Sequence, residues 1–491
     1  MPGCGCRAPP TRWRWSRVIG PARPTRSSTS TRPARPISGS RADPAGEDAM
    51  QARAVTMPAA ARDPNDLYLR CLACALVGYA VFGKGFAVLG VAPLYVGELT
   101  LGLGLLALMR TRCWFAMLAT PTSLLLAVLI VWVLVRTVPF IGAYGVDAVR
   151  DSVIVVYGLF AFVVVALLLE KPARLGWILR AYAGFAFLYG LIGGFLFATT
   201  VTMADSLRIP GTQIQLPYVR AGEAAFHLGG AAVFVLLGLR RVNALWCFVL
   251  CINMAVVTVS RAATLACLVP ILLGVVLGRQ FRRFAPAALI GLSLLAGAAL
   301  ADLRVMMPGD REVGAMQIVE GISSVFGASE AANFEGTKEF RLRWWRTIRD
   351  YTLHGPYFWS GKGFGVNLAM EDGYHHFVTQ EATLRSPHNG HMTVLARAGV
   401  PGLALWIALL GAWFGMLLHS LLLARQAGHG RWAAVFVWIT CYGAGILVNA
   451  SFDVALEGPM SGIWFWSVVG LGIGASMIYR AGLVDAIGDP A

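Results

Sequence analysis

One boundary in the sequence separates a long polar segment from a long apolar run: Arg385-Ser386-Pro387-His388-Asn389-Gly390-His391-Met392. The polar segment before it is the longest between two apolar runs, and the run after it extends to about residue 422. Such a change is typical of a chain that passes from water into a membrane. His388 and Asn389 therefore fall at the membrane surface, where a polar pair is a candidate for function.

The composition predicts an integral membrane protein. Of the 491 residues, 57% are hydrophobic and 14% are charged, whereas soluble domains carry about 25% charged residues. Apolar runs of roughly 20 residues, each long enough to cross a bilayer, recur along the chain. The net charge of +15 comes mainly from an N-terminal tail and from short connectors, as the positive-inside rule describes. It therefore does not indicate a nucleic-acid-binding protein.

We predict an all-α, polytopic bundle with about twelve membrane helices and a large outward-facing loop before the tenth. The apolar runs cover approximately residues 67–88, 91–109, 113–135, 152–170, 177–200, 223–239, 243–259, 262–278, 284–301, 389–422, 432–450 and 459–479. Basic residues follow every second run, which predicts that both termini are cytoplasmic. The connectors at about 136–151, 201–222, 302–388 and 451–458 then face outward.

The same pattern divides the chain into five parts. Residues 1–65 are rich in Arg and Pro and are expected to be either a disordered tail or a mis-assigned start. Residues 66–301 hold the first nine spans, and residues 302–388 form the outer loop. Residues 389–480 hold the last three spans, and a short cytoplasmic tail covers residues 481–491.

The outer loop contains two basic motifs. Residues 340–349, Phe-Arg-Leu-Arg-Trp-Trp-Arg-Thr-Ile-Arg, predict an amphipathic helix at the membrane interface. The second motif is a glycine-rich turn, Ser360-Gly361-Lys362-Gly363-Phe364-Gly365. Backbone N–H groups of such a turn can bind phosphate, but this one lacks the Lys-Ser/Thr ending of a nucleotide-binding loop.

Two arginines are candidates for anion binding. Arg261 lies between two apolar runs with almost no loop, where a charged residue is costly and hence a functional candidate; the alternative is an arginine that extends to lipid headgroups. Arg341 precedes Trp345 by one helical turn, so the two share a helix face. Its planar guanidinium suits a phosphate, although the arginines around it also fit a solvated stripe.

His388 is the candidate general base because its side chain titrates near neutral pH. The alternative is a structural histidine at a helix end. Asn389 is suited to cap the next helix or to orient His388. A metal site formed by His388 and His391 lacks a third ligand in the motif, so we expect no metal. Cys71 and Cys74 form a C-x-x-C pair in an apolar run with no second ligand pair nearby, which favours packing over metal binding.

The spacing of these motifs resembles the signature of the bacterial O-antigen ligase and polymerase family of polytopic membrane glycosyltransferases. The carrying residues are His388-Asn389, followed after nine residues by Gly399-x-x-Gly402, together with Arg341-x-x-x-Trp345, Gly361-x-Gly363-Phe364-Gly365 and Ser260-Arg261-Ala262. They occur in the family's order, and the resemblance covers about residues 65–480. Many relatives carry a Pro-Asn pair near residues 207–225, where this chain has Leu216-Pro217-Tyr218-Val219-Arg220.

The resemblance implies an inverting, metal-independent glycosyl transfer in the outer leaflet of the bacterial inner membrane, with no cofactor. The donor is expected to be a glycan on undecaprenyl diphosphate, and the acceptor a lipid or glycan hydroxyl. In this scheme His388 is the general base, and Arg261 and Arg341 bind the diphosphate. The secondary candidates are Asn389, Arg220, Arg343 and Lys362.

Two alternatives to ligation stay open at this point. A repeat-unit polymerase of the same family would share every motif above and differ in its acceptor. A secondary transporter would also suit about twelve spans, but its ionisable residues should lie near the bilayer midplane and its halves should repeat. The polar residues of this chain instead gather on the predicted outer side.

Overall fold

The computed structural model describes residues 63–488, except positions 92, 203–207, 210–213, 259, 302–303, 308–310, 315–331 and 375–383. The described residues all belong to the part of the chain that follows Ala61. The tail predicted over residues 1–65 lies outside them up to position 62, and the first helix begins at Pro64.

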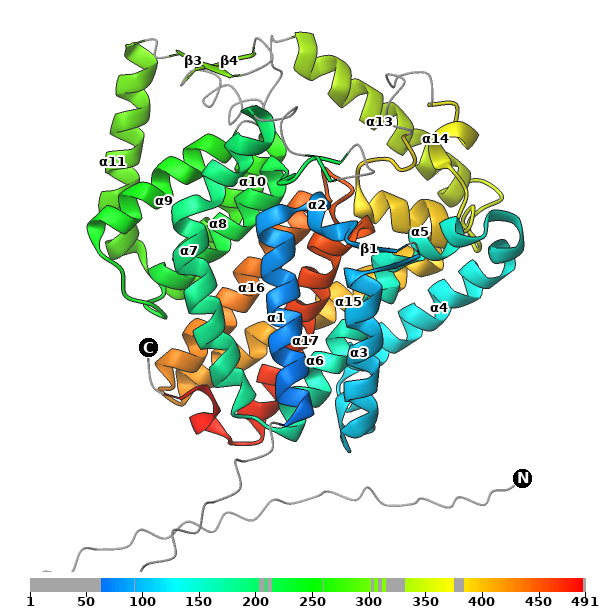
Figure 1. The fold of residues 1–491 in the computed structure, drawn as a ribbon, viewed down its shortest axis with the longest axis horizontal. Coiled ribbons are helices and arrows are strands. Elements are labelled where there is room, and N and C mark those ends of the chain that lie inside the picture. Colours follow the sequence, from blue (N-terminus) through cyan, green and yellow to red (C-terminus); the bar gives the residue numbers. More distant parts are fainter. Residues whose placement is uncertain are drawn as a thin grey trace, which may run out of the picture. The chain divides into compact units, whose positions relative to one another are not determined.

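Helices make up most of the described chain (Figure 1). The α-helices are α1 (Pro64–Phe82), α2 (Lys84–Ala87), α3 (Val96–Arg110), α4 (Pro121–Tyr144), α5 (Val146–Val156), α6 (Leu159–Glu170), α7 (Arg174–Thr202), α8 (Ala221–Leu236), α9 (Ala244–Val257), α10 (Arg261–Gly278), α11 (Phe281–Leu300), α13 (Ala332–Leu353), α14 (Leu368–Glu371), α15 (Gly390–Gln426), α16 (Gly430–Ala450) and α17 (Pro459–Arg480). Short 3₁₀ turns are η1 (Ala116–Leu118), η3 (Ala455–Glu457) and η4 (Val484–Ile487).

Two antiparallel strand pairs complete the described elements. Strand β1 (Gly90–Val91) pairs with β2 (Leu94–Tyr95), with Gly90 opposite Tyr95. Strand β3 (Arg304–Met307) pairs with β4 (Arg311–Gly314), with Arg304 opposite Gly314.

The all-α polytopic membrane fold is confirmed, and each predicted apolar run overlaps a described helix. Seven helices in the described ranges are long and apolar enough to cross a membrane, namely α1, α4, α7, α10, α15, α16 and α17. Helices α5 and α6 pass the same test together but bend by 43° at their junction. Helices α8 and α9 are apolar, but their 16 and 14 residues are fewer than the roughly 20 of a straight crossing. The sequence analysis counted twelve membrane-spanning runs. The described helices that are long enough to span a membrane are fewer than twelve.

Side-chain caps fix where several helices begin. The Ser260 hydroxyl accepts a hydrogen bond from the Ala263 N–H, so Arg261 is the first residue of α10. The Asn389 side chain accepts hydrogen bonds from the N–H groups of His391 and Met392 and starts α15. These caps satisfy N–H groups that have no partner inside the helix. Asn389 therefore has the capping role that its sequence position allowed.

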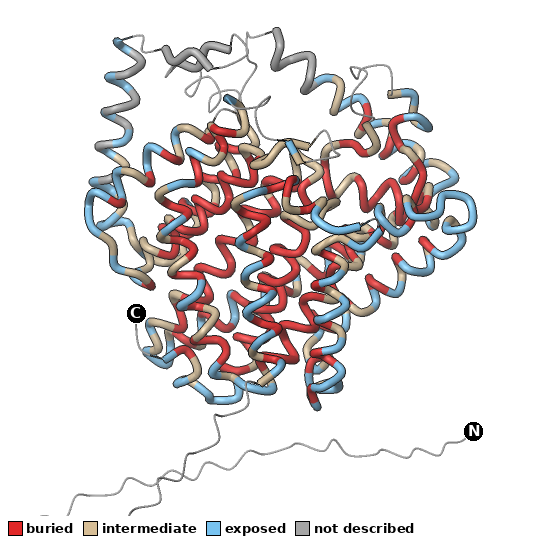
Figure 2. The backbone as a smooth tube through the Cα atoms, viewed as in Figure 1, coloured by how far each residue is buried: buried red, intermediate tan, exposed pale blue. Residues whose placement is uncertain are grey.

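Helices α16 and α17 form the centre of the bundle, and the buried residues concentrate around them (Figure 2). Close contacts between helices depend on glycine, since a Cβ on Gly470 would lie 2.5 Å from the Ala161 carbonyl oxygen. Buried indoles add hydrogen bonds between helices, as when Trp413 donates to the carbonyl of Val469 at 3.1 Å. Close packing and hydrogen bonds are the contacts that hold helices together in lipid, where the hydrophobic effect is weak.

Helix α15 is broken at Gly399, whose φ of 69° is not helical. Its 37 residues would extend about 55 Å as one straight helix, well beyond the roughly 30 Å hydrocarbon core. The Val400 N–H donates to the carbonyl of Phe358 instead of continuing the helix. The break separates a first section, residues 390–398, which lies mostly buried within the protein, from the membrane-spanning section that follows.

Candidate active site

Helix α13 packs on the first section of α15 and carries Arg341 with it. Trp344 and Ile348 are fully buried against Leu395 and Ala396. Trp344 also donates to Asp372 at 2.7 Å. The basic, aromatic motif therefore builds part of the protein core at Trp344, where the sequence predicted an amphipathic helix at the membrane interface.

The next residue of α13 holds the segment that precedes His388. Trp345 donates to the carbonyl of Pro387 at 2.9 Å. Arg341, one turn earlier on the helix, donates from Nη1 to the carbonyl of Phe452 at 2.9 Å. Arg341 and Trp345 share a helix face, as predicted. Through it, α13 contacts both the segment before His388 and the connector after α16.

The backbone fixes the direction of the His388 side chain. His388 has a φ of 52°, in the left-handed region that residues other than glycine rarely adopt. Such a strained conformation persists only where the surrounding structure holds it, and strained residues are common at functional sites. The imidazole is 31% exposed, and its Nδ1 lies 3.6 Å from Oδ1 of Asp453.

Asp453 connects three of the residues singled out in the sequence. Arg220 donates from Nη1 to both carboxylate oxygens of Asp453, at 3.1 and 3.2 Å. His388 faces the same carboxylate, and Arg341 binds the carbonyl of the preceding residue, Phe452. The group Arg220, Arg341, His388 and Asp453 is called the Asp453 cluster below. Asp453 was not among the predicted residues, and its only sequence signal is an acidic side chain in the connector predicted at 451–458.

The Asp453 carboxylate is ionised under all physiological conditions. Burial raises its pKa, but the nearby His388 imidazole and the positive charge of Arg220 outweigh burial and hold the pKa at about 2. Burial lowers the pKa of Arg341, and the charge of Asp453 opposes this shift. Positive and negative groups therefore stabilise one another in the cluster.

We expect the ionised Asp453 to stabilise the fold in a pH-dependent way. Because its folded-state pKa of about 2 is below the ordinary 3.8, the contribution is complete above about pH 4 and is lost as the pH falls toward 2. The difference in unfolding free energy between the wild type and Asp453→Asn should be constant from pH 7 to 5 and shrink by about 1 kcal/mol by pH 3. Unfolding in detergent measures it, and an unchanged difference at pH 3 would contradict the assignment.

Arg261 lies at the same end of the bundle as the Asp453 cluster. Gly222 in α8 faces Asn449 in α16, Gly229 faces Cys267 in α10, and Gly445 faces Ala266. Helices α8 and α10 therefore start at one level, beside the end of α16 and close to the 451–458 connector. The structure thus brings Arg220, Arg341 and His388 around Asp453 and places Arg261 at the same end.

The other secondary candidates have partners elsewhere. Lys362 donates to Asp372 at 2.6 Å, and its ammonium lies over the Tyr351 ring at 4.5 Å from the centroid. Arg343 is exposed and pairs with Glu339 within α13. The structure therefore does not bring Lys362 or Arg343 to the Asp453 cluster.

The glycine-rich turn binds protein groups through the N–H groups considered for phosphate. Lys362 N–H donates to the carbonyl of Ala396, and Gly363 N–H donates to that of Arg397. Gly365 N–H donates to the Asp151 carboxylate at 3.1 Å. At Gly361, with a φ of 59°, a Cβ would lie 2.4 Å from the Arg397 backbone. The turn is therefore a packing element against α15, and the phosphate interpretation is wrong for these N–H groups.

A buried ion network supports the loop before His388. Asp151 in α5 forms an ion pair with Arg397 at 2.9 Å and accepts a hydrogen bond from Arg385 at 3.1 Å. Arg397 is only 1% exposed and also donates to the carbonyls of Gly363 and Val366. Arg385 stands three residues before His388, so the network holds that segment in place. Its partners come from α5, the outer loop and α15, and sequence spacing gave no sign of the pairing.

His391 has a structural role. Its Nε2 lies 3.1 Å from the Ser451 hydroxyl, and its Nδ1 accepts from the indole of Trp406 at 2.9 Å. Both ring nitrogens are therefore engaged within the protein. His388, whose ring is partly exposed, is the histidine of the motif that can meet a substrate.

Residues 246–407 match the family model described as O-antigen ligase. This match, over about a third of the chain, supports the O-antigen ligase/polymerase family. The matched range includes Arg261, Arg341 and His388, whereas Arg220 and Asp453 lie outside it. A search of curated proteins found no match.

The match supports a membrane glycosyltransferase of ligase or polymerase type. It also implies lipid-linked glycan substrates and association with a membrane. The apolar helices agree with a multi-pass membrane protein.

Proposed function

We propose that the protein transfers a glycan from undecaprenyl diphosphate to an acceptor hydroxyl on the outer face of the bacterial inner membrane. The observation that carries the proposal is the Asp453 cluster, in which two arginines and a partly exposed histidine converge at one end of a membrane bundle. The reaction requires such a set, since a diphosphate leaves while a hydroxyl loses its proton.

In the proposed reaction, His388 removes the proton of the acceptor hydroxyl. Its Nδ1 faces Asp453, so Nε2 is the nitrogen that takes the proton, and the carboxylate stabilises the imidazolium that forms. The acceptor oxygen attacks the anomeric carbon from the side opposite the diphosphate. The new C–O bond forms as the bond to the diphosphate breaks, which leaves its electron pair on the diphosphate and inverts the configuration.

Positive charge is needed where the diphosphate leaves. Arg341 and Arg220 supply it beside His388, and Arg261 supplies it from the start of α10. Asp453 holds the Arg220 guanidinium by two hydrogen bonds. It thereby fixes the relative positions of base and cation before the substrate arrives.

Arg341→Ala should lower glycan transfer by about 10²–10³-fold, the usual effect of losing one donor to a developing negative charge. Arg343→Ala is the matched control, because this exposed arginine lies on the same helix and pairs only with Glu339 among the residues described. Transfer is measured in membranes supplied with lipid-linked oligosaccharide, with protein amounts compared by immunoblot. Equal rates for the two variants would contradict the role of Arg341.

The product of that assay separates ligase from polymerase. Glycan joined to lipid A-core indicates ligation, our first interpretation, and a ladder of longer glycans on the lipid diphosphate indicates polymerisation. A deletion strain tests the transporter alternative. Accumulation of lipid-linked glycan supports transfer, and loss of solute uptake without accumulation supports transport.

A further inference from the structure

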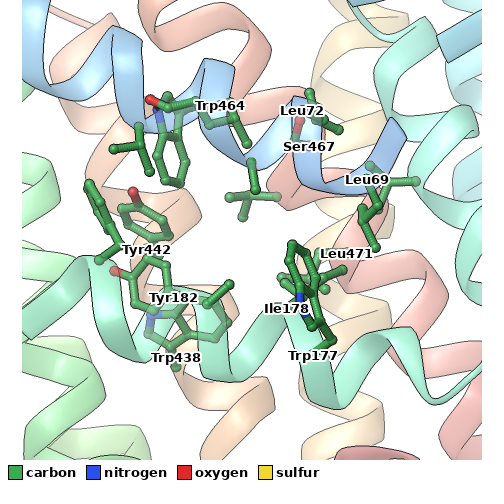
Figure 3. A pocket seen from close by; sticks show the side chains of 17 residues that line it. Leu69, Leu72, Trp177, Ile178, Tyr182, Trp438, Tyr442, Trp464, Ser467 and Leu471 are labelled. Atoms are coloured by element: carbon green, nitrogen blue, oxygen red, sulfur yellow. Dashed lines mark hydrogen bonds between the residues drawn. The ribbon is translucent and has the colours of Figure 1, made fainter. Parts of the chain in front are cut away.

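A cavity lies between α1, α7, α16 and α17, outside the Asp453 cluster (Figure 3). Its volume is about 110 Å³, whereas one water needs about 10–15 Å³ on this measure. Leu69, Leu72, Ile178 and Leu471 line one part of it, and Trp464 lies at another. Most of the lining residues are apolar, so the space suits a hydrocarbon chain.

One part of the cavity lies toward the end of the bundle opposite the Asp453 cluster. Trp177 lines it and stands three residues after the start of α7 at Arg174. At the other end of α7, the Thr200 hydroxyl accepts from the Val219 N–H, next to Arg220. A lipid that enters beside Trp177 therefore has its headgroup in the leaflet opposite the proposed transfer site. This position excludes the diphosphate of the donor from the mouth of the cavity.

A polar cleft adjoins the cavity at this end and is called its mouth here. It shares Leu69 and Trp177 with the apolar cavity and is also lined by Asp66, Arg70 and Lys171. Lys171 pairs with Asp66 at 2.7 Å. Arg70 is exposed and has no ion-pair partner among the residues that the structure describes. The cation available to a ligand is therefore Arg70.

Three residues that line the cavity also have polar atoms without partners. The Ser467 hydroxyl, the Tyr182 hydroxyl and the Trp438 indole nitrogen are buried, and none has a hydrogen-bond partner within the described ranges. Ser467 precedes Leu471 by about one helical turn, or roughly 5.4 Å. A hydrogen-bond acceptor on a ligand beside Ser467 would bind the Ser467 hydroxyl. A buried donor without a partner costs free energy, so this contact would be favourable.

We propose that the cavity and its mouth bind one glycerophospholipid. Its phosphate binds Arg70, an ester carbonyl accepts from the Ser467 hydroxyl, and one acyl chain fills the space beside Tyr182, Trp438 and Trp464. The order of groups follows the chemistry of this lipid class, in which the ester lies a few atoms below the phosphate. A polyprenyl phosphate is hydrocarbon from its first carbon and cannot satisfy Ser467.

Native mass spectrometry of the full-length protein in mild detergent tests the proposal, with added palmitoyl-oleoyl phosphatidylglycerol as the probe. The wild type should retain one lipid. Arg70→Gln should lower retention about tenfold by removing the phosphate contact, and Ala73→Phe should do so by filling the cavity that Ala73 lines. The controls are Arg112→Gln and Ala408→Phe, because both residues are exposed and line neither cavity.

A lipid with ether-linked chains tests the ester contact. It should bind the wild type more weakly than the ester lipid does, and Ser467→Ala should remove this difference. Equal retention by Ala73→Phe and the wild type would overturn the proposal. Displacement of the phospholipid by undecaprenyl phosphate at equal concentration would also overturn it, by showing a polyprenyl site.

Discussion

Replacing His388 with alanine should reduce glycan transfer by about 10²–10⁴-fold, the usual contribution of a general base. The loss follows because Nε2 of His388 is the proposed proton acceptor and His391, the other histidine of the motif, has both ring nitrogens engaged. The rate is measured in membranes with lipid-linked oligosaccharide and a supplied acceptor. Protein amount and thermal stability should stay close to those of the wild type, because the imidazole is partly exposed.

His354→Ala is the matched control, since His354 is exposed just beyond the end of α13. Its transfer rate should equal that of the wild type. If His388→Ala also transfers at full rate, His388 is only a helix-end residue, and the catalytic scheme is wrong even if the chain is of this family. If His388→Ala is inactive and also unfolded, the variant His388→Gln distinguishes lost chemistry from lost structure.

Replacing Asp151 with alanine should destabilise the protein by about 3–5 kcal/mol, because it leaves a buried charge without its partner. The charge belongs to Arg397, whose side chain is 1% exposed and lies 2.9 Å from Asp151. Arg385 loses the same partner, so the segment before His388 loosens and transfer should fall as well. Thermal unfolding in detergent measures the effect.

Asp147→Ala is the matched control on the same helix. Asp147 is 43% exposed and pairs with Arg150 and Arg385 near the surface, and such pairs contribute about 0–1 kcal/mol. The double variant Asp151→Ala/Arg397→Met should recover much of the stability, because it removes the buried charge together with its partner. Equal melting temperatures for Asp151→Ala and Asp147→Ala would show that the network is not a stabilising element.

The sequence determined the fold class and the capping position at Asn389. A backbone in lipid must satisfy its own hydrogen bonds, so apolar runs of sufficient length predict helices without knowledge of their neighbours. Caps are equally local, as Ser260 and Asn389 show, because each binds N–H groups two or three residues ahead. The His388 motif was visible for the same reason, since it stands at the boundary between a polar loop and an apolar run.

Only the tertiary structure decided which of these residues meet. Arg220 and Asp453 are 233 positions apart, and Arg385 and Asp151 are 234 apart, so no local period connects them. The break at Gly399 is also a tertiary effect, because Val400 finds its hydrogen-bond partner in the loop at Phe358. Lys362 and Arg343 resembled Arg341 in the sequence because all three are basic residues in one loop. The packing of Trp344 on α15 orients α13, so that Arg341 lies in the Asp453 cluster and Arg343 faces solvent. Lys362 instead pairs with Asp372, because a charged side chain near a buried surface binds the partner that the fold places within reach.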